Sequence, residues 1–320
     1  MTTGDQVINR TMPYEIERAR TSLAQNGKSF NWAAKLFKRH DADRIAQLYA
    51  FCRYADDIAD NLDEANAKLQ LEDILSDLRR GRSRIATVSN LLKLLDGNQT
   101  ALKSARYLVA ALLADTGKVR IQHQNDLIRY AYGVAGTVGI MVCEVVGAHD
   151  SAALPFSIDL GIGMQLTNIA RDVVEDARRD RIYLPADAFQ ETVDPDQILN
   201  GDPQIHRELF STIVSVLKQA DAYYRSAYAG MRYLPLRSRV VILTAAHIYE
   251  AIGPRILQNK QRYWQTRIYV NAQRKLYHTL RAIIGLISNP KFWPLGRHPE
   301  HDPLLHVALR GLPGSHSGVI

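Results

Sequence analysis

The sequence predicts an all-α protein, and three observations support this fold class. Apolar residues recur at helical spacing along most of the 320-residue chain. Glycine, proline and capping residues stand where these periodic segments begin or end. No run of alternating apolar and polar residues indicates a strand. Because no low-complexity linker or internal repeat divides the chain, we expect residues 1–320 to form a single helical domain.

In the N-terminal half, residues suited to helix ends mark the expected helices. Pro13 and Gly27 bracket a helix over residues 14–26. Ser29 can cap a short helix that ends at Phe37, and Asp41 can cap a longer one that follows it. Further helices are expected over residues 69–80, 89–95, 101–115 and 125–146, which are followed by Gly81, Gly97, Gly117 and Gly147.

The C-terminal half continues the helical pattern with one interruption. Helices are expected over residues 154–175, 204–230, 237–258 and 273–287. Between the first two of these, residues 178–185 have no helical period and predict a basic loop. Scattered proline, glycine and histidine residues predict a mostly irregular tail over residues 289–320.

Composition restricts the class of protein. The content of 46% hydrophobic and 23% charged residues is ordinary for a globular protein. Cys52 and Cys143 lie in apolar helical patterns, so we interpret them as reduced core residues. Residues 1–14 contain no apolar run typical of a signal peptide, and the longest uncharged run, residues 130–143, is too short to span a bilayer. We therefore expect a cytoplasmic protein.

Basic residues gather in the last third of the chain. From Arg225 onward there are 14 Lys and Arg residues against 3 Asp and Glu residues, a net charge of +11, whereas the whole chain carries +7. Nucleic acid, anionic lipid and phosphorylated substrates would all be attracted to such a segment. A solvated basic surface without a partner is the alternative. No nucleic-acid-binding motif is present, so we expect no nucleic-acid partner.

A stripe of polar side chains follows an apolar stretch on the helix expected after residue 154. Gln165, Asn168, Asp172 and Asp176 fall within roughly 80° of one another if each residue turns the helix by about 100°. An unpaired buried carboxylate is very costly, so such a group must be paired or must hold a cation. This stripe is therefore a candidate ligand-binding face.

A second stripe lies in the N-terminal half. Arg53, Asp56 and Asp60 share a helix face within roughly 60°. We expect the two stripes to face each other across a cavity and to hold divalent metal between them. Magnesium suits this arrangement, because it takes carboxylate oxygens together with phosphate oxygens of a substrate. Zinc does not, because no Cys or His lies on either stripe. The alternative for either stripe alone is a solvated acidic face. For the first stripe, Asp56, Asp57 and Asp60 would then be paired to Arg53.

Arginines accompany the acidic stripes. Arg53 and Arg171 lie within the two stretches, and Arg178, Arg179 and Arg181 follow in the basic loop. The guanidinium group matches the geometry of phosphate oxygens, so this set predicts binding of a diphosphate. Surface salt bridges are the alternative for each arginine alone.

Three glycines stand close together in the expected helix over residues 125–146. Gly133, Gly136 and Gly139 each cost about 1 kcal/mol relative to alanine in a helix interior. Such a cost indicates either that a long apolar ligand lies against the helix or that another helix packs very closely. Candidate aromatic residues of a cavity are Phe30, Trp32, Tyr249 and Tyr263, although each alone is more typical of plain core.

These motifs resemble the signature segments of the squalene/phytoene synthase family. The resemblance rests on Asp56-Asp57-Ile-Ala-Asp60, on residues 130–139 and on residues 165–176. Residues 180–185 are similar to the segment that follows in that family, and residues 28–30 are similar to its N-terminal substrate-contact segment. The resemblance covers residues 15–285 approximately and is strongest toward the bacterial members that make phytoene.

The resemblance implies an all-α isoprenoid synthase fold around a central cavity, and it implies a role for each matching residue. Magnesium or manganese would be bound by Asp56, Asp60, Asn168, Asp172 and Asp176. Substrate and diphosphate would be held by Ser29, Phe30, Arg53, Arg171, Arg181, Tyr249 and Arg267. Tyr130 and Gln165 would lie near the reacting carbons and complete, with the four aspartates, the catalytic set.

The activity that the resemblance implies is a prenyl transfer, the first committed step of carotenoid biosynthesis. Two geranylgeranyl diphosphates would be joined head to head, through prephytoene diphosphate, to give phytoene. Metal ions and arginines would stabilise the diphosphate as it leaves. An apolar cavity would keep the carbocations from water, tyrosine rings could stabilise them, and released diphosphate could accept the proton.

Three other expectations accompany this interpretation. A dehydrosqualene or squalene synthase that uses farnesyl diphosphate is the alternative within the family, and a non-catalytic scaffold or assembly factor is the alternative outside enzymology. We expect no NADPH, because the resemblance is to members that make phytoene. The missing dinucleotide-binding fingerprint adds little, since all-α members of the family bind their reductant without one. Peripheral binding to anionic lipid on the inner face of the cell membrane is expected from the basic C-terminal third, and other carotenoid-pathway enzymes are potential partners.

Overall fold

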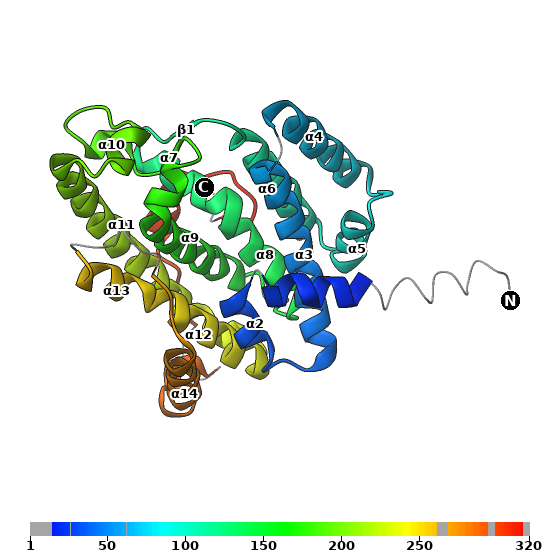
Figure 1. The fold of residues 1–320 in the computed structure, drawn as a ribbon. Helices are drawn as coiled ribbons and strands as arrows, with labels where there is room; N and C mark the ends of the chain where they lie inside the picture. Colours follow the sequence, from blue (N-terminus) through cyan, green and yellow to red (C-terminus); the bar gives the residue numbers. More distant parts are fainter. Residues whose placement is uncertain (1–14, 26, 62, 261–267, 294–297, 316–320) are drawn as a thin grey trace, which may run out of the picture.

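Helix α9 (Ala153–Ala177) lies near the centre of the molecule, and other long helices pack against it (Figure 1). The structure is a computed structural model that describes residues 15–25, 27–61, 63–260, 268–293 and 298–315. Helices α8 (Thr137–Val145), α11 (Pro203–Gly230) and α12 (Leu236–Glu250) all contact α9. Apolar residues surround most of α9, which explains its burial along most of its length.

The N-terminal helices form a second apolar core beside this one. Residues 15–25 are helical, and they are followed by α2 (Lys28–Ala34). Apolar side chains of α3 (Arg39–Asn61), α4 (Glu64–Arg80), α5 (Ala86–Leu94) and α6 (Gln99–Ala114) pack together, and α8 contributes Met141 and Val145 to the same cluster. The remaining α-helices are α7 (Gln124–Ala131), α10 (Pro195–Leu199), α13 (Ile252–Gln258) and α14 (Ala272–Ser288).

Local chemistry at the helix ends agrees in part with the sequence prediction. The side chains of Asp63, Asn98 and Asn271 cap α4, α6 and α14 by accepting a backbone N–H. Gly81 ends α4 in the left-handed conformation, with a φ of 70°. The predicted cap at Ser29 is wrong, because α2 already begins at Lys28. The predicted cap at Asp41 is also wrong, because this residue lies in the first turn of α3.

Three features depart from the predicted elements. Residues Tyr132–Gly136 form a π-helical turn between α7 and α8. The predicted basic loop contains a short strand, β2 (Arg181–Ile182), which pairs in parallel with β1 (Val119–Arg120). The helix expected over residues 237–258 is interrupted at Ala251, where α12 ends and α13 begins. Helical periodicity alone predicts neither the extra residue of a π turn nor a pairing of two residues per strand.

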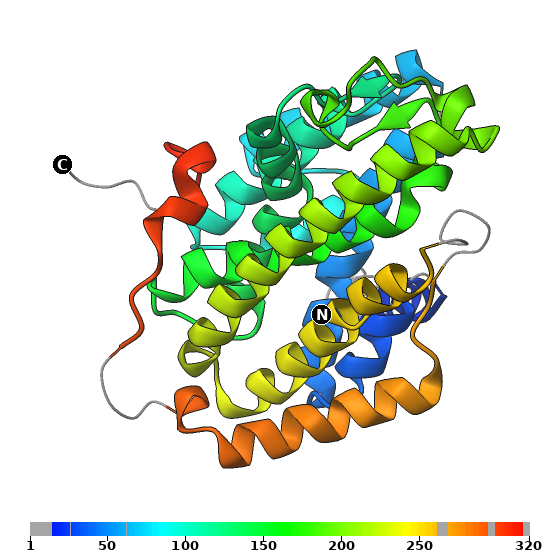
Figure 2. The ribbon, with the colours of Figure 1, turned by 90° about the vertical axis from the view of Figure 1, so that its left-hand side faces the viewer.

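The C-terminal tail is largely irregular, as predicted, but it is packed against the helical body. It contains short 3₁₀ segments at Pro290–Phe292 and Pro303–Leu309. Figure 2 shows it running away from the end of α14 toward its last described residues, drawn in red. The hydroxyl of Tyr132 donates to the carbonyl of Pro313 at 2.6 Å, and that of Tyr223 donates to Leu305 at 2.9 Å.

One stretch among the described residues, Leu236–Gln258, is long and apolar enough to cross a membrane. Within the protein, 56% of its most apolar window is buried. Its helix α12 contributes Val241, Ile242 and Ala245 to the wall of an internal cavity. We therefore interpret the stretch as a core element.

Candidate active site

A cavity of about 380 Å³ lies between the N-terminal helices and α9. Its wall is mostly apolar and is formed by side chains of α2, α3, α6, α8, α9 and α12, among other segments. Polar residues of both predicted stripes also line it, so part of each stripe adjoins one cavity. Seven predicted site residues line the cavity: Phe30, Arg53, Asp56, Tyr130, Gln165, Asn168 and Tyr249.

The first acidic stripe lies near the end of α3. Arg53 donates to Asp56 at 3.1 Å and forms an ion pair with Asp57. Asp56 lines the cavity, and its side chain is partly exposed there. Desolvation by the surrounding protein, with the nearby charge of Asp60, raises the pKa of Asp56 to about 6. Burial would lower the pKa of Arg53, but Asp56 and Asp57 outweigh it and raise the pKa.

The second stripe occupies the C-terminal part of α9. Arg171 donates to the carboxylate of Asp172 in a bidentate pair, with Nε at 2.7 Å from Oδ1. Burial and, next, the charge of Asp172 raise the pKa of Asp176 well above its usual value. The Oδ1 atom of Asn168 is buried and accepts no hydrogen bond from a described residue. This stripe therefore combines crowded carboxylates with a buried acceptor that still has its lone pairs available.

Arginines from the loop after α9 join the two stripes. Arg179 and Arg181 both form ion pairs with Asp60 on α3, the latter at 2.6 Å. Their charges also act on Asp176 of the second stripe, where they oppose the rise of its pKa. The strand pairing of β2 with β1 holds Arg181 in place. Arg179 and Arg181 are thus shared by the two stripes.

Asp115 belongs to the site although the sequence analysis did not select it. The hydroxyls of Tyr130 and Tyr183 donate to its Oδ2 atom at 3.1 Å and 2.8 Å. The two tyrosine rings are stacked, with their centroids 4.5 Å apart. Burial raises the pKa of Asp115 to about 6, although the hydrogen bonds from the tyrosines oppose this shift. Asp115 thereby fixes the Tyr130 hydroxyl beside the cavity.

A signal for Asp115 was present in the sequence. It directly follows α6, where a carboxylate meets the negative end of the helix dipole. We interpreted the position only as the end of a helix before Gly117. An acidic residue at an unfavourable helix end, after an apolar helix, was reason to look for a function.

Several predicted site residues lie outside the cavity wall. Asp60, Arg171, Asp172, Asp176 and Arg181 belong to the charged group beside it. Ser29 lies on α2 next to Phe30 but is not one of the lining residues. Trp32 also turns away from the cavity and donates its indole N–H to Thr279. The predictions for Arg267 and Tyr263 fall outside the described residues.

The glycines near Tyr130 serve close helix packing. A Cβ atom on Gly139 would lie 2.2 Å from the carbonyl oxygen of Ser157 on α9. In return, a Cβ on Gly161 of α9 would lie 2.3 Å from the carbonyl oxygen of Ala135. Backbone therefore approaches backbone here, which supports the helix-packing explanation for Gly139. Gly139 and Gly161 also border the cavity, so the close contact shapes its wall.

The oxygen atoms of the charged group are suitable ligands for a hard divalent cation. Apart from Arg53, every side chain of the two stripes offers a carboxylate or an amide oxygen, the ligands that magnesium and manganese prefer. Burial and, next, the charge of a neighbouring aspartate raise the pKa values of Asp56 and Asp176. A cation placed among them would stabilise the ionised carboxylates and could use the buried Oδ1 of Asn168.

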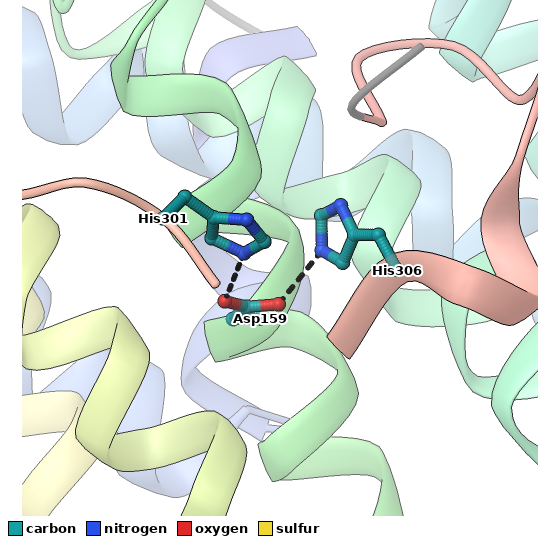
Figure 3. A group of neighbouring side chains, drawn as sticks. All are labelled: Asp159, His301 and His306. Carbon is teal, nitrogen blue, oxygen red and sulfur yellow. Dashed lines mark hydrogen bonds and ion pairs between the residues drawn. The ribbon is translucent and has the colours of Figure 1, made fainter. Parts of the chain in front are cut away.

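A second cluster of metal-type side chains lies elsewhere on α9. Asp159 accepts a hydrogen bond from Nε2 of His301 and another from Nε2 of His306, each at 2.8 Å (Figure 3). Among the described residues, only this group combines three His, Cys, Asp or Glu ligand atoms close enough to hold one ion. Burial would raise the pKa of Asp159, but the two hydrogen bonds outweigh it and lower the pKa. The cluster fastens the C-terminal tail to α9, and no residue of the predicted metal site belongs to it.

Comparison with known proteins places the chain among relatives of similar length. The family description "Squalene/phytoene synthase" matches residues 23–274. A 15-cis-phytoene synthase of Enterobacter agglomerans is 35% identical over 261 residues, which cover 78% of this chain and 88% of the relative. A phytoene synthase of Rhodobacter capsulatus is 35% identical over 284 residues, or 86% and 80% of the two chains.

Solved structures agree with this placement. A dehydrosqualene synthase crystallised with a ligand superposes with a TM-score of 0.74 at 25% identity and covers 87% of this chain and 99% of its own. A squalene synthase of Alicyclobacillus acidocaldarius shares the fold, with a TM-score of 0.63 at 22% identity, over 77% of this chain and 94% of its own. The all-α isoprenoid synthase fold is thus confirmed, and this chain belongs to the squalene/phytoene synthase family.

Proposed function

We propose that this chain is a prenyl-transferring enzyme that condenses two molecules of geranylgeranyl diphosphate, head to head, into phytoene. Prephytoene diphosphate is the intermediate, and diphosphate is released at both steps. The observation that carries this proposal is the meeting of two acidic stripes and their arginines with one largely apolar cavity. Relatives named phytoene synthase, at 35% identity over most of their length, support the choice of substrate.

In this proposal the oxygen ligands hold magnesium or manganese, which supplies electrostatic stabilisation of the departing diphosphate. The ligands are Asp56 and Asp60 from α3 and Asn168, Asp172 and Asp176 from α9. Carboxylates one helical turn apart present their oxygens side by side without closing a cage. The substrate phosphates can therefore complete the coordination.

Arginines bind the diphosphate in the same group. Arg53, Arg171 and Arg181 each form an ion pair with an aspartate of the stripes. Once cations neutralise these aspartates, each guanidinium can turn its donors to phosphate without leaving a buried charge unpaired. Tyr249 lies close enough to Arg171 to affect its pKa, which supports a position near the diphosphate. Arg267 remains a family-based prediction.

The cavity supplies the environment for the carbocations. Its apolar wall keeps water away from cations that would otherwise be hydrolysed. Tyr130 lines it, and its ring is held by stacking on Tyr183 while its hydroxyl is held by Asp115. An aromatic face fixed in this way can stabilise a nearby positive charge. Released diphosphate, held by the arginines, is the proposed acceptor of the final proton.

Incubation with substrate tests the proposal. The purified protein is given geranylgeranyl diphosphate or farnesyl diphosphate with magnesium, with and without NADPH, and the hydrocarbon is identified. We expect phytoene from geranylgeranyl diphosphate without NADPH. Product from farnesyl diphosphate alone would indicate a dehydrosqualene synthase, or a squalene synthase if NADPH is required. The absence of any product from folded protein would favour a non-catalytic scaffold.

The location proposed for the enzyme is the cytoplasm, with peripheral binding to the inner face of the membrane. Substrate tails and product are lipophilic, and the last third of the chain carries a net charge of +11. Other enzymes that act on the product are potential partners. We also infer that the chain forms one domain.

A further inference from the structure

An apolar stripe lies on the outer face of α14. Five large apolar side chains of this helix are more than half exposed: Leu276, Tyr277, Leu280, Ile284 and Ile287. Their spacing places them within an arc of roughly 100° on the helix. Ile287 is 74% exposed and Ile284 is 63% exposed. Isolated exposed apolar residues are normal, but five on one helix face form a patch.

The opposite face of α14 already provides its packing. His278, Thr279, Ala282 and Leu286 are buried, and α14 contacts α12 and α2. The indole N–H of Trp32 on α2 donates to Thr279 at 3.0 Å. In Figures 1 and 2 the helix lies at the edge of the molecule, outside α12. The exposed stripe is therefore not needed to hold α14 in place.

Arginine side chains lie at one flank of this stripe, within a basic segment of the sequence. Between Glu250 and Glu300 the sequence contains nine Lys and Arg residues and no Asp or Glu. Arg274 and Arg281 are exposed on α14 itself, at one flank of the apolar arc. Arg255 of α13 lies near enough to Arg274 for its pKa to be lowered, first by burial and then by that charge. Apolar and cationic groups thus occupy one surface.

We propose that the outer face of α14 is a docking surface for an anionic lipid bilayer, with the helix lying in the plane of the interface. A helix with an apolar stripe and flanking arginines buries the stripe at the headgroup boundary while the arginines meet anionic headgroups. A second copy of this chain would bring two copies of this basic segment together, and like charges would oppose that contact. A polyanion such as RNA would leave the aliphatic side chains without a partner.

This surface is one helix layer away from the cavity. Residues of α12 and α2, on which α14 packs, line the cavity. The inference rests on the proposed function in one respect: a lipophilic product needs a path that avoids water. Docking through α14 would place the wall formed by α12 and α2 toward the membrane.

Vesicle sedimentation of the full chain tests the proposal. Vesicles of phosphatidylcholine alone are compared with vesicles that also contain phosphatidylglycerol. We expect Leu280→Ser combined with Ile284→Ser to lower partitioning by about tenfold or more, because two inserted apolar side chains are lost. Arg274→Gln combined with Arg281→Gln should lower binding to the anionic vesicles by about fivefold for each arginine, and this difference should disappear in high salt.

Matched substitutions on other faces serve as controls. Leu69 on α4 and Val214 on α11 are also exposed, and their replacement by serine should leave partitioning unchanged. Arg79→Gln with Arg80→Gln removes two exposed charges from α4. All variants should unfold at the wild-type temperature and should turn over substrate in detergent at the wild-type rate.

Two results would overturn the proposal. One is sedimentation of the Leu280→Ser and Ile284→Ser variant that equals the wild type. The other is a dimer in solution that this variant abolishes, since the stripe would then be a contact between copies. Sedimentation needs no turnover, so these results are independent of whether the protein makes phytoene.

Discussion

Asp172 lies beside Arg171 on α9, within the charged group that adjoins the cavity. We predict that Asp172→Asn lowers kcat by about 100-fold or more, because a neutral amide binds a divalent cation more weakly than a carboxylate and removes one negative charge from the ligand set. Thermal unfolding should change little, since the amide oxygen can still accept a hydrogen bond from Arg171. Glu175→Gln, on the same helix but outside the stripe, is the control and should keep near-normal turnover. A near-normal rate for Asp172→Asn would remove this residue from the metal site.

The second prediction for a single residue concerns Asp115. We expect its substitution to lower activity and to raise stability. Asp115→Asn should lower kcat by about tenfold or more, because the Tyr130 hydroxyl loses its charged acceptor. The folded pKa of about 6 lies above the usual value of 3.8, so the folded state holds the proton more tightly. Stability contributed by this group is therefore present below about pH 4 and is lost as the pH rises through about 6.

Denaturant unfolding at several pH values checks the stability part of this prediction. At pH 7 the asparagine variant should be more stable than the wild type by about 2 kcal/mol, and the difference should shrink toward pH 4. Turnover of Tyr130→Phe, alone and combined with Asp115→Asn, tests whether the two residues act through one bond. Fully additive losses would show that Asp115 does not act through Tyr130.

The helix elements were largely predictable because their apolar periodicity is long and regular. The expected helices over residues 154–175 and 204–230 correspond to α9 and α11, with ends displaced by two residues at most. The π turn at Tyr132–Gly136 and the parallel pair β1–β2 were not predictable. The first depends on one residue of backbone register, and the second depends on contact between segments about 60 residues apart in the chain.

The contact between α8 and α9 gives a prediction at the scale of elements. Gly139→Ala should reduce the free energy of unfolding by about 1–3 kcal/mol, because its Cβ would meet the Ser157 carbonyl and neither backbone can move freely. Gly285→Ala in α14 is the matched control, since its Cβ would meet only Phe292 at 3.7 Å. That substitution should stabilise the protein by about 0.5–1 kcal/mol. Equal effects at both positions would contradict the packing role of Gly139.

At the scale of the whole molecule, the two acidic stripes were predictable because each repeats within one helix. The contacts that join the stripes were not predictable. Arg181 reaches Asp60 only because of the fold, and Asp115 approaches Tyr130 from another helix. The contacts of the C-terminal tail could not be predicted for the same reason. His301 and His306 looked like scattered residues of an irregular segment, and only the fold places them against Asp159. Spacing along the chain predicts faces of helices, whereas contacts between distant segments depend on how those faces pack.

The tail contact yields the last prediction. Because an ionised carboxylate can only accept hydrogen bonds, both histidines must donate to Asp159 through Nε2–H. His306→Ala leaves this buried charge with one donor fewer, so we expect the free energy of unfolding to fall by about 1–3 kcal/mol. The tail should also become more sensitive to limited proteolysis.

Two comparisons make this result specific to the cluster. His149→Ala replaces an exposed histidine and should change neither stability nor proteolysis. Zinc should leave the unfolding temperature of the wild type unchanged, because the ring nitrogens that face Asp159 already donate hydrogen bonds to it. Stabilisation by one equivalent of zinc that is lost in His306→Ala would contradict the hydrogen-bonded arrangement. It would show that the cluster binds a metal, because two imidazoles and a carboxylate are ligands that zinc accepts.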